Sequence, residues 1–431
     1  MKRKTSALFI FTKCINYFAQ LRKSYPDTIA VWYDGSSRII DGIVDFIEPE
    51  RIFVEDGIGI ENIKSQLVGS EEIEIVKQES GITTGGSILA VMPSNDTHVH
   101  LFKNIFPKVS DCQIINLTTR KEHARQELEK LRFPFIDRGI PSIVPQIYSS
   151  LLLGNDWGEA EMLVLSKFRN HGVPVYCLQE SVINFNDWIH RMEWCDYPMI
   201  QGVASLKYLK RNVYFLTGNP RYETLTVETL STTDKVMINS NFTYNIFEEI
   251  RDQWVSDVVD SCGETGIDYI ISQHPRDTGN LSRFKVATSS AAKIHDMIKS
   301  CSTIVTRFSS VIHEGLALGR VVIYYNPHGE SMFYDFEPDG IHLILAVTKE
   351  DLKNALMKTK VAERTDPRHD PFFVNYIMRH CGSSDHRASD RVAQSLTIER
   401  RESNRDRRAM STVLKTKLFV RLVKKKLKSV L

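Results

Sequence analysis

Short strand-like runs alternate with helix-like segments through residues 268–327, and this alternation constrains the fold more than any other feature of the sequence. A helix is predicted at residues 311–318, with Gly319 as its C′ residue. Three runs are rich in β-branched or aromatic side chains: residues 269–271, 302–306 and 321–325. Strands that alternate with helices in this way build βαβ units with parallel strands. The segment therefore predicts an α/β domain with a parallel sheet.

Two of these predicted strands end in polar turns. His274-Pro275-Arg276 follows the first, where Pro275 removes a backbone donor and keeps His274 out of helical geometry. Ser309-Ser310 follows the second, at the start of the predicted helix. Open α/β sheets hold ligands beyond the carboxyl ends of their strands, and hydroxyls with N–H groups at a helix start suit an anion. We therefore expect a nucleotide phosphate to bind here, at the ends of adjacent parallel strands.

Composition indicates an ordinary globular protein with room for two domains, since 42% of the 431 residues are hydrophobic and 25% are charged. A net charge of +2 gives no indication of a nucleic-acid partner. The seven scattered cysteines form no CxxC pair, so we expect neither a disulfide framework nor a zinc site, and a cytoplasmic setting fits best. The apolar run at residues 7–11 is interrupted by Lys13 and is interpreted as a strand, not a signal peptide. No window approaches the roughly 20 apolar residues of a transmembrane helix.

The amino-terminal half follows the same alternation, apart from residues 52–86, which show no regular pattern. Gly154-Asn155-Asp156 and Gln179-Glu180-Ser181 each follow a predicted strand, so their side chains would lie at the ligand-binding edge of the sheet. Strands are predicted at residues 7–11, 28–33, 87–92, 113–117, 150–153, 173–178, 199–201 and 213–216, and helices at 120–131, 159–169 and 204–211. The turn that begins at Thr217 predicts a hinge into a second α/β domain.

The last fifty residues change character. Residues 383–410 are dense in Arg, Asp, Glu and Ser, and predict a solvated linker. Residues 411–431 contain no acidic residue and place rows of apolar side chains at i,i+4 spacing among seven lysines and arginines. A basic amphipathic helix of this kind can lie on an anionic membrane surface, where each basic residue adds about 1 kcal/mol. The alternative is a helix that docks on the protein or on a partner.

Four features between Thr217 and Tyr325 resemble the nucleotide-binding half of the CDP-glycerol glycerophosphotransferases (teichoic acid polymerases) and related two-domain GT-B glycosyltransferases. They are Gly218-Asn219-Pro220-Arg221, Gln273-His274-Pro275, the unit helix-strand-Ser309-Ser310-helix, and the strand after Gly319. A His-Pro pair also occurs in bacterial sialyl- and Kdo-transferases, which use CMP-sugars. The resemblance covers about a quarter of the chain, and the amino-terminal half matches only in architecture.

The resemblance implies a GT-B-like α/β fold, in which two Rossmann-like domains face each other across a cleft. Residues 1–216 would form the acceptor domain and residues 217–382 the nucleotide-binding domain. Ser309 and Ser310 would contact the donor phosphates, with His274 and Arg276 beside them. The predicted nucleotide-binding residues are Gly218, His274, Pro275, Arg276, Ser309, Ser310, His313 and Glu314. For His313 and Glu314, a solvated pair in the first helical turn is an equal alternative.

The first domain departs from the family. Teichoic acid polymerases carry a His-Gly pair after the last strand of that domain, and its histidine is thought to act as base. The comparable turn here is Gln179-Glu180-Ser181, so Glu180 becomes the expected catalytic base, with Asp156 and Asp34 as rivals and His274 as a further catalytic candidate. The alternative for Glu180 is a buried carboxylate paired with a basic residue. The change favours a sugar donor over a glycerol-phosphate donor.

These observations predict an enzyme without metal or cofactor that transfers a sugar from a CMP- or other NDP-sugar. The acceptor would be a surface polysaccharide, such as capsule or lipopolysaccharide, or a lipid-linked glycan, at the inner face of the cell membrane. Two alternatives stay open: an enzyme resembling the sugar-nucleotide 2-epimerases, and a non-catalytic scaffold of a polysaccharide assembly complex.

Overall fold

The computed structural model divides the chain into two compact units. The first unit comprises Met1–Glu223 together with Cys381–Leu431, and the second comprises Thr224–His380. The first unit therefore extends beyond the expected boundary at residue 216, and the chain returns to it after His380. The structure describes residues 6–11, 27–33, 49–55, 58–65, 67, 73–77, 88–109, 111–118, 122–182, 191–209, 213–227, 233–243, 246–290, 293–331, 334–361, 366–382 and 385–397. Asp34 and the basic segment 411–431 lie outside the described residues.

The first unit is built on one parallel sheet with the strand order β4-β3-β2-β1-β11-β10-β9-β8-β5-β6-β7. Its central strands are buried on both faces, which explains the continuous apolar sequence Leu151-Leu152-Leu153. Leu152 pairs with Val91 on one side and with Tyr176 on the other. The strands are β1 (Ser6–Phe11), β2 (Asp27–Tyr33), β3 (Arg51–Val54), β4 (Glu74–Lys77), β5 (Ile88–Met92), β6 (Cys112–Leu117), β7 (Phe135–Arg138), β8 (Tyr148–Leu153), β9 (Val175–Leu178), β10 (Tyr197–Ile200) and β11 (Phe215–Leu216).

The direction of the chain through this sheet reverses between two neighbouring strands, β5 and β8. From β5 the chain continues outward to β6 and β7, whereas from β8 it continues the other way to β9, β10 and β11. Such a reversal opens a crevice at the carboxyl ends of the two strands, where α/β proteins place their ligands. The sheet therefore designates one edge of the first unit as a candidate site.

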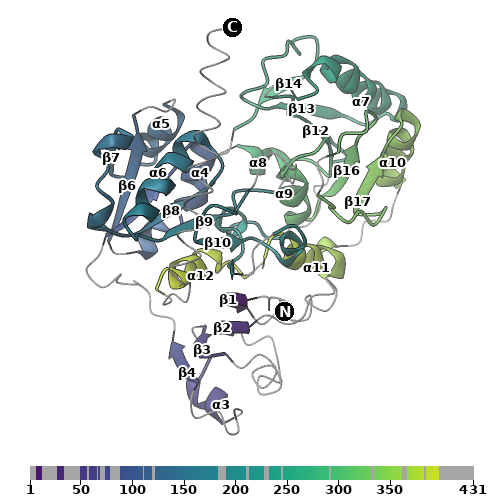
Figure 1. Cartoon of the computed structure of the whole chain (residues 1–431). Coiled ribbons are helices and arrows are strands. Elements are labelled where there is room, and N and C mark those ends of the chain that lie inside the picture. The colour runs from purple at the N-terminus through teal and green to yellow at the C-terminus, as the bar shows by residue number, and fades with distance from the viewer. Residues whose placement is uncertain are drawn as a thin grey trace, which may run out of the picture. The chain divides into compact units, whose positions relative to one another are not determined.

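Helices flank this sheet (Figure 1). They are α3 (Ile60–Lys64), α4 (Asp96–Phe102), α5 (His123–Lys130), α6 (Glu159–Asn170) and α12 (Ala388–Ser395). The basic segment expected as a helix at residues 204–211 forms a 3-10 helix, η5 (Val203–Lys207). None of the helices in the part of the chain that the structure describes has the length and apolar character that crossing a bilayer requires.

Helix α12 corrects the expectation of a solvated linker at residues 383–410. All eight residues of this helix are buried. Arg391 donates from Nε to the Thr217 carbonyl at 2.7 Å and forms an ion pair with Asp385 at 2.7 Å. Arg391 and Asp385 are thus paired inside the first unit, which a count of Arg, Asp and Ser does not reveal. Residues 383–384 and 398–410 of the expected linker lie outside the described residues.

The second unit contains a parallel sheet with the order β14-β13-β12-β15-β16-β17. The strands are β12 (Val236–Ser240), β13 (Tyr269–Gln273), β14 (Val286–Thr288), β15 (Thr303–Thr306), β16 (Val321–Tyr325) and β17 (Leu343–Ala346). The helices are α7 (Arg251–Thr265), α8 (Ile294–Lys299), α9 (Val311–Ala317), α10 (Lys349–Val361) and α11 (Pro371–His380). The expected α/β class, with parallel sheets in two domains, is confirmed.

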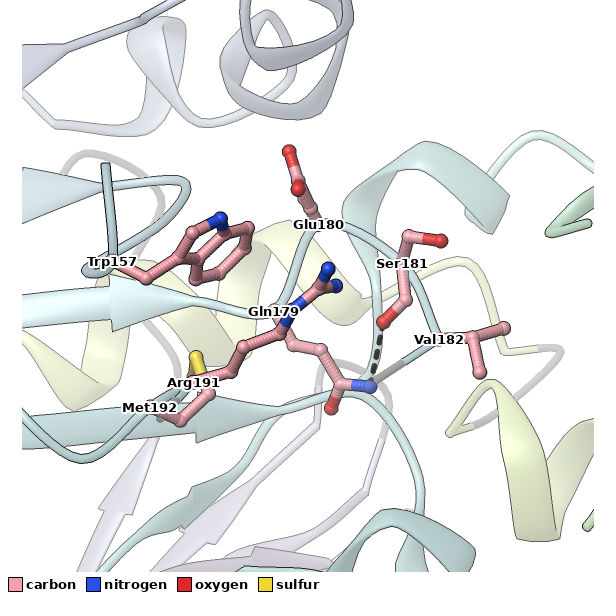
Figure 2. Close-up of a pocket in the computed structure, with 7 residues that line it drawn as sticks. All are labelled: Trp157, Gln179, Glu180, Ser181, Val182, Arg191 and Met192. Atoms are coloured by element: carbon pink, nitrogen blue, oxygen red, sulfur yellow. Dashed lines mark hydrogen bonds between the residues drawn. The ribbon is translucent and has the colours of Figure 1, made fainter. Parts of the chain in front are cut away.

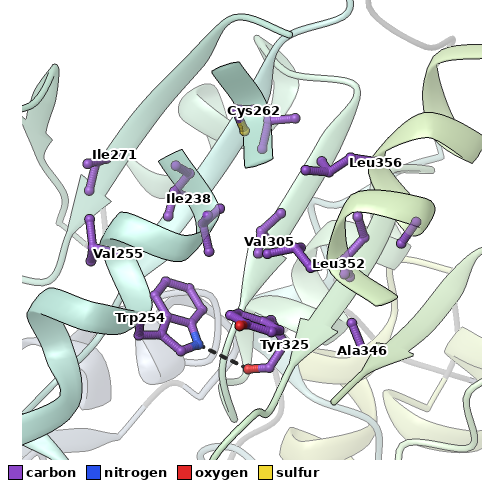
Figure 3. Packing of buried hydrophobic residues seen from close by; sticks show 14 of the residues in the cluster. Ile238, Trp254, Val255, Cys262, Ile271, Val305, Tyr325, Ala346, Leu352 and Leu356 are labelled. Carbon is purple, nitrogen blue, oxygen red and sulfur yellow. Dashed lines mark hydrogen bonds between the residues drawn. The ribbon is translucent and has the colours of Figure 1, made fainter. Parts of the chain in front are cut away.

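An apolar core joins α7 and α10 to this sheet (Figure 3). Trp254 of α7 is 1% exposed and donates from its indole N–H to the Tyr325 carbonyl at 3.1 Å, so the ring is buried without an unpaired donor. Helix α7 ends at Gly266, whose φ of +64° is the left-handed geometry that glycine adopts without strain. This core fixes the strands whose carboxyl ends carry the polar turns.

Candidate functional sites

Glu180 and His98 meet at the carboxyl edge of the first sheet. Glu180 lies two residues after β9, and His98 lies in the first turn of α4, just beyond β5. His98 Nδ1 accepts a hydrogen bond from the Ser94 N–H at 3.1 Å, so Nε2 carries the proton and donates to Glu180 Oε2. The imidazole is fully buried, whereas the Glu180 side chain is 20% exposed. His98 therefore orients a carboxylate that solvent can reach.

The residues around His98 leave its ring no freedom. Asn95 caps α4 by accepting from the His98 N–H at 2.9 Å. Ser94 donates from its hydroxyl to Glu161, which is fully buried on α6. On the β8 side, a Cβ added to Gly154 would lie 2.7 Å from His98 Nδ1. His98 was not among the residues expected from the sequence. The signal for it is the polar turn after β5, with the N-cap Asn95 three residues before a histidine.

Glu180 lines a small pocket that encloses about 190 Å³ (Figure 2). Its other lining residues are Trp157, Gln179, Ser181, Val182, Arg191 and Met192. Gln179 is buried and holds the loop from below, because its Oε1 accepts from the Gln201 N–H at 3.0 Å and its Nε2 donates to the Ser181 carbonyl at 2.8 Å. Part of this space is open to solvent, so the pocket suits a single group of a ligand.

The charge state of Glu180 follows from its neighbours. Burial by itself raises the pKa of Glu180, but the interactions with His98, Arg191 and Arg221 outweigh burial and leave the pKa below its ordinary value. Glu180 is therefore ionised at neutral pH and can accept a proton from a hydroxyl group. The alternative expected for Glu180 was a buried carboxylate paired with a basic residue. His98 is such a partner, so the Glu180 carboxylate is both paired and accessible.

Asp156, the expected rival base, has a structural role instead. Its side chain is completely buried. It accepts hydrogen bonds from the backbone N–H groups of Met192, Trp194 and Cys195 at 2.8, 2.7 and 3.1 Å. A carboxylate with this burial and these partners anchors the 192–195 loop and cannot reach an acceptor hydroxyl. Asp156 is therefore not a catalytic base in this structure.

In the second unit the chain reverses direction between β12 and β15. His274 follows β13 and Ser309 follows β15, so the strands that precede these turns are not adjacent as expected, since β12 lies between them. Asn241, directly after β12, spans part of this gap by donating from Nδ2 to the Phe308 carbonyl at 3.1 Å. The reversal nevertheless places all three turns at one edge of the sheet, beside its crevice.

The His-Pro turn is held from within. The His274 N–H donates to the Ser240 carbonyl at 2.8 Å, and His274 Nδ1 accepts from the Arg276 N–H at 3.1 Å, so Nε2 carries the proton. Asp277 is buried and pairs with Arg251 Nε at 2.8 Å. The His274 and Arg276 side chains are half-buried and Pro275 is exposed. The turn thus presents donors at the sheet edge while Asp277 fixes its backbone.

The serine turn keeps its hydroxyls half-buried. Ser309 Oγ accepts from the Val311 N–H, the first of α9, at 3.2 Å, and Ser310 is the N-cap residue. A serine hydroxyl that accepts one hydrogen bond still carries its own O–H donor. Ser310 Oγ donates to Glu314 Oε1 at 3.5 Å. Ser309 therefore remains a candidate for a phosphate contact, whereas Ser310 can make one only by giving up this long hydrogen bond.

His313 and Glu314 are not the solvated pair that was one of the two expectations. Both side chains are fully buried. His313 lies among aromatic rings and its Nδ1 is 3.1 Å from the Tyr376 hydroxyl, and burial lowers its pKa well below the ordinary value. Glu314 contacts His295 Nε2 at 3.1 Å. Neither side chain is open to a ligand in this structure.

The need for a glycine at position 218 is explained by its backbone conformation and by close packing inside the first unit. Its φ is +82°, and an added Cβ would lie 3.2 Å from Arg391 Nη2 and 3.3 Å from Ala388 Cβ of α12. The other predicted nucleotide-binding residues belong to the second unit. Gly218 thus serves the contact with α12. Among the described residues, no group of three or more His, Cys, Asp or Glu side chains is arranged to hold a metal ion.

No family model and no curated protein matches this sequence. Similar solved structures include the UDP-GlcNAc 2-epimerase of Methanocaldococcus jannaschii in complex with UDP-GlcNAc and UDP, at 14% identity and a TM-score of 0.48, over 73% of this chain and 100% of that chain. The wall teichoic acid polymerase TagF is similar at 10% identity and a TM-score of 0.50, over 74% of this chain and 90% of that chain. The spinosyn rhamnosyltransferase SpnG, complexed with thymidine diphosphate, has 8% identity and a TM-score of 0.39, over 72% and 96%. These neighbours are GT-B fold proteins, and the likeness to TagF supports the GT-B-like fold expected from the sequence.

Proposed function

We propose that this protein is a glycosyltransferase that moves a sugar from a nucleotide-activated donor to a glycan or lipid-linked glycan acceptor. The observation that carries the proposal is the partly exposed Glu180 carboxylate, oriented by buried His98 in a pocket at the carboxyl edge of a parallel sheet. A general base needs an ionised carboxylate that is accessible and fixed in direction, and Glu180 meets these requirements.

In the proposed reaction, Glu180 takes the proton from an acceptor hydroxyl group. The oxygen of that hydroxyl group attacks the anomeric carbon of the donor sugar at the same time. The bond between that carbon and the phosphate oxygen breaks, and the electron pair leaves with the nucleotide. Negative charge then develops on the phosphate, where donors are most effective. We assign this role to His274, Arg276, Ser309 and Ser310, whose turns lie at one edge of the second sheet.

The decisive experiment compares the wild type with Glu180→Gln in a transfer assay with CMP-, CDP-, UDP- and GDP-sugars, with product analysis by mass spectrometry. Glu180→Gln should lower turnover by roughly 10²- to 10⁴-fold, because loss of a general base costs about that much. Glu159→Gln, an exposed carboxylate in the first turn of α6, is the matched control. Unchanged turnover in folded Glu180→Gln would contradict the assigned role of Glu180, and absence of transfer by the wild type with all four donors would favour the scaffold.

Product analysis also separates transfer from epimerisation, the second enzymatic alternative. A transferase releases the nucleotide and lengthens the acceptor, whereas an epimerase returns an intact nucleotide sugar of altered configuration without an acceptor. We further propose that the reaction needs no metal, so that turnover persists in EDTA. A surface polysaccharide such as capsule or lipopolysaccharide remains the proposed acceptor.

We also propose peripheral attachment to the inner face of the membrane through residues 411–431, on the charge pattern of their sequence alone. Co-sedimentation with vesicles of phosphatidylcholine and phosphatidylglycerol tests this. Deleting residues 411–431 should abolish sedimentation with anionic vesicles, and retention of binding in the deletion variant would contradict it.

A further inference from the structure

Arg191 is a half-buried cation in the Glu180 pocket, and its Nε donor is not used by the described residues. Its Nε is inaccessible to solvent and has no hydrogen-bond partner within the described ranges of the chain. Its guanidinium carbon lies over the face of the Trp157 ring, 4.4 Å from the ring centroid. A buried donor without an acceptor costs free energy, and arginine carries five N–H donors. A ligand oxygen could therefore accept the hydrogen bond that Arg191 Nε does not make to the described residues.

Among the described residues, the negative charges near Arg191 do not offset the effect of its burial. Burial lowers the pKa of Arg191, and this effect exceeds the opposing influence of Glu180 and Asp156. The carboxylate of Asp156 is occupied by the three backbone N–H groups of the 192–195 loop. Figure 2 shows Trp157, Glu180 and Arg191 around the same pocket. An added anion would therefore meet an undercompensated cation.

We infer that this pocket binds an anionic group, a carboxylate or a phosphate, carried by the acceptor sugar, and that Arg191 is the residue that holds it. A planar guanidinium stacked on an aromatic ring matches the two oxygens of either group by paired hydrogen bonds. The pocket is small and opens to solvent, so it admits the anionic group itself while the rest of the acceptor sugar lies outside it. The inference deepens the proposed function and rests on it for the word acceptor, while anion binding itself does not depend on turnover.

The charge of Arg191 also affects how strong a base Glu180 is. Arg191 is one of the charges that keep the pKa of Glu180 low, and a low pKa makes a carboxylate a weaker base. An anion on Arg191 cancels that charge, so the pKa of Glu180 rises when an acidic acceptor binds. By linkage, loss of the negative charge on Glu180 must strengthen anion binding by the same factor. The two residues therefore make opposite contributions to anion affinity.

The test measures binding to the full-length protein by ligand-observed NMR titration. Three probes are compared: methyl glucuronoside, which carries a carboxylate, glucose 6-phosphate, which carries a phosphate, and the neutral methyl glucoside. The wild type should bind at least one anionic probe more tightly than the neutral one. Arg191→Gln should weaken that binding about tenfold or more, and Glu180→Gln should strengthen it. Arg138→Gln removes an exposed arginine on β7 and should leave all three affinities unchanged.

Equal affinity of the wild type for the three probes, or anion preference that survives Arg191→Gln, would overturn the inference. If Arg191→Gln does not fold, Arg191→Lys, which keeps the charge but not the planar fork, and Glu180→Gln still report the two predicted directions. The stronger anionic probe identifies the carboxylate or the phosphate. If Glu180→Gln binds the anion more tightly but retains turnover, the anion site stands and the proposed catalytic role of Glu180 falls.

Discussion

Glu180 owes its orientation to a histidine 82 residues earlier in the chain. Burying a neutral imidazole is favourable only when both ring nitrogens find partners, and His98 has one in the Ser94 N–H and the other in Glu180. The two hydrogen bonds also define the tautomer. At the residue scale the site therefore depends on how closely the backbone of β8 approaches this ring.

Gly154→Ala tests that close approach. The new methyl group would lie 2.7 to 2.8 Å from three atoms of the His98 ring, which cannot move without breaking its hydrogen bonds. We expect a loss of about 1 to 3 kcal/mol in stability, as for overpacking elsewhere, together with loss of turnover. Differential scanning calorimetry and the transfer assay measure both.

The matched control for this substitution is Gly263→Ala, in the exposed part of α7, where an added Cβ would meet nothing within 4 Å. It should stabilise the protein by about 0.5 to 1 kcal/mol, because alanine is more stable than glycine in the interior of a helix. An unchanged melting temperature and normal turnover in Gly154→Ala would show that the His98 ring is not confined as described.

His342 gives the second unit a predictable dependence on pH. Its ring bridges Asp339 at 2.7 Å and Asp370 at 2.9 Å. Burial by itself lowers the pKa of His342, but the hydrogen bonds and charges of the two aspartates outweigh burial and raise it above 6.5. A raised pKa means that the imidazolium stabilises the fold fully below the unfolded value and that this contribution is lost as pH rises through the folded value.

We therefore expect His342→Gln to lower the melting temperature more at pH 5.5 than at pH 9. His369→Gln, whose side chain is 82% exposed in the same unit, should show little change at either pH. Thermal melts of the three proteins across this range measure the effect. A destabilisation by His342→Gln that grows with pH would contradict the assigned direction.

At the scale of elements, the polar turns of the second unit lie at one edge of the sheet because all its strands are parallel, although β12 separates the strands β13 and β15 that precede two of them. The turns after β13 and β15 flank the end of β12, and the Asn241 side chain reaches from β12 to the Phe308 carbonyl. Strands in a sheet lie roughly 4.8 Å apart, so the two turns are separated by about twice that distance. A group as extended as a nucleotide phosphate with its ribose can contact both.

Ser309→Ala tests whether this edge holds the nucleotide. We expect about tenfold weaker binding of the preferred nucleotide in a calorimetric titration with CMP, CDP, UDP and GDP, because one hydrogen bond to a charged phosphate is lost. Ser282→Ala, an exposed serine of the same unit, should bind as the wild type does.

The same substitution removes the hydrogen bond from the first N–H of α9 to Ser309 Oγ, so stability is measured alongside and should fall by about 1 kcal/mol. A stability loss without any change in nucleotide affinity would leave Ser309 as a helix cap alone. That result would remove the serine turn from the proposed donor site.

At the scale of the whole molecule, the first unit is completed by residues from the far end of the described chain. The chain leaves this unit after Glu223 and returns at Cys381. Helix α12 then packs on Gly218, and Ser389 donates from Oγ to Glu223 at 2.7 Å. Contacts between residues about 170 positions apart thus define where the first domain ends.

Arg391→Met should destabilise the first unit by about 3 to 5 kcal/mol, because it breaks the ion pair with the Asp385 carboxylate, whose side chain is 8% exposed. Hydrogen exchange followed by mass spectrometry should show faster exchange in peptides that contain β11 and α12, with peptides of the second sheet unchanged. Arg125→Met, which removes an exposed arginine of α5, is the control and should alter exchange little. Uniform acceleration across both units, or none, would contradict this account.

The sequence by itself determined most strands, the α/β class, and the turns that carry Glu180, His274 and Ser309. These follow from local causes: β-branched runs, helix caps, and glycine or proline at strand ends. Tertiary structure alone decided which of these turns lie together. It placed His98 behind Glu180, occupied Asp156 with backbone N–H groups, buried His313 and Glu314, and returned α12 to the first unit. Burial and long-range pairing depend on strand order and on residues far apart in sequence, and no local pattern records them.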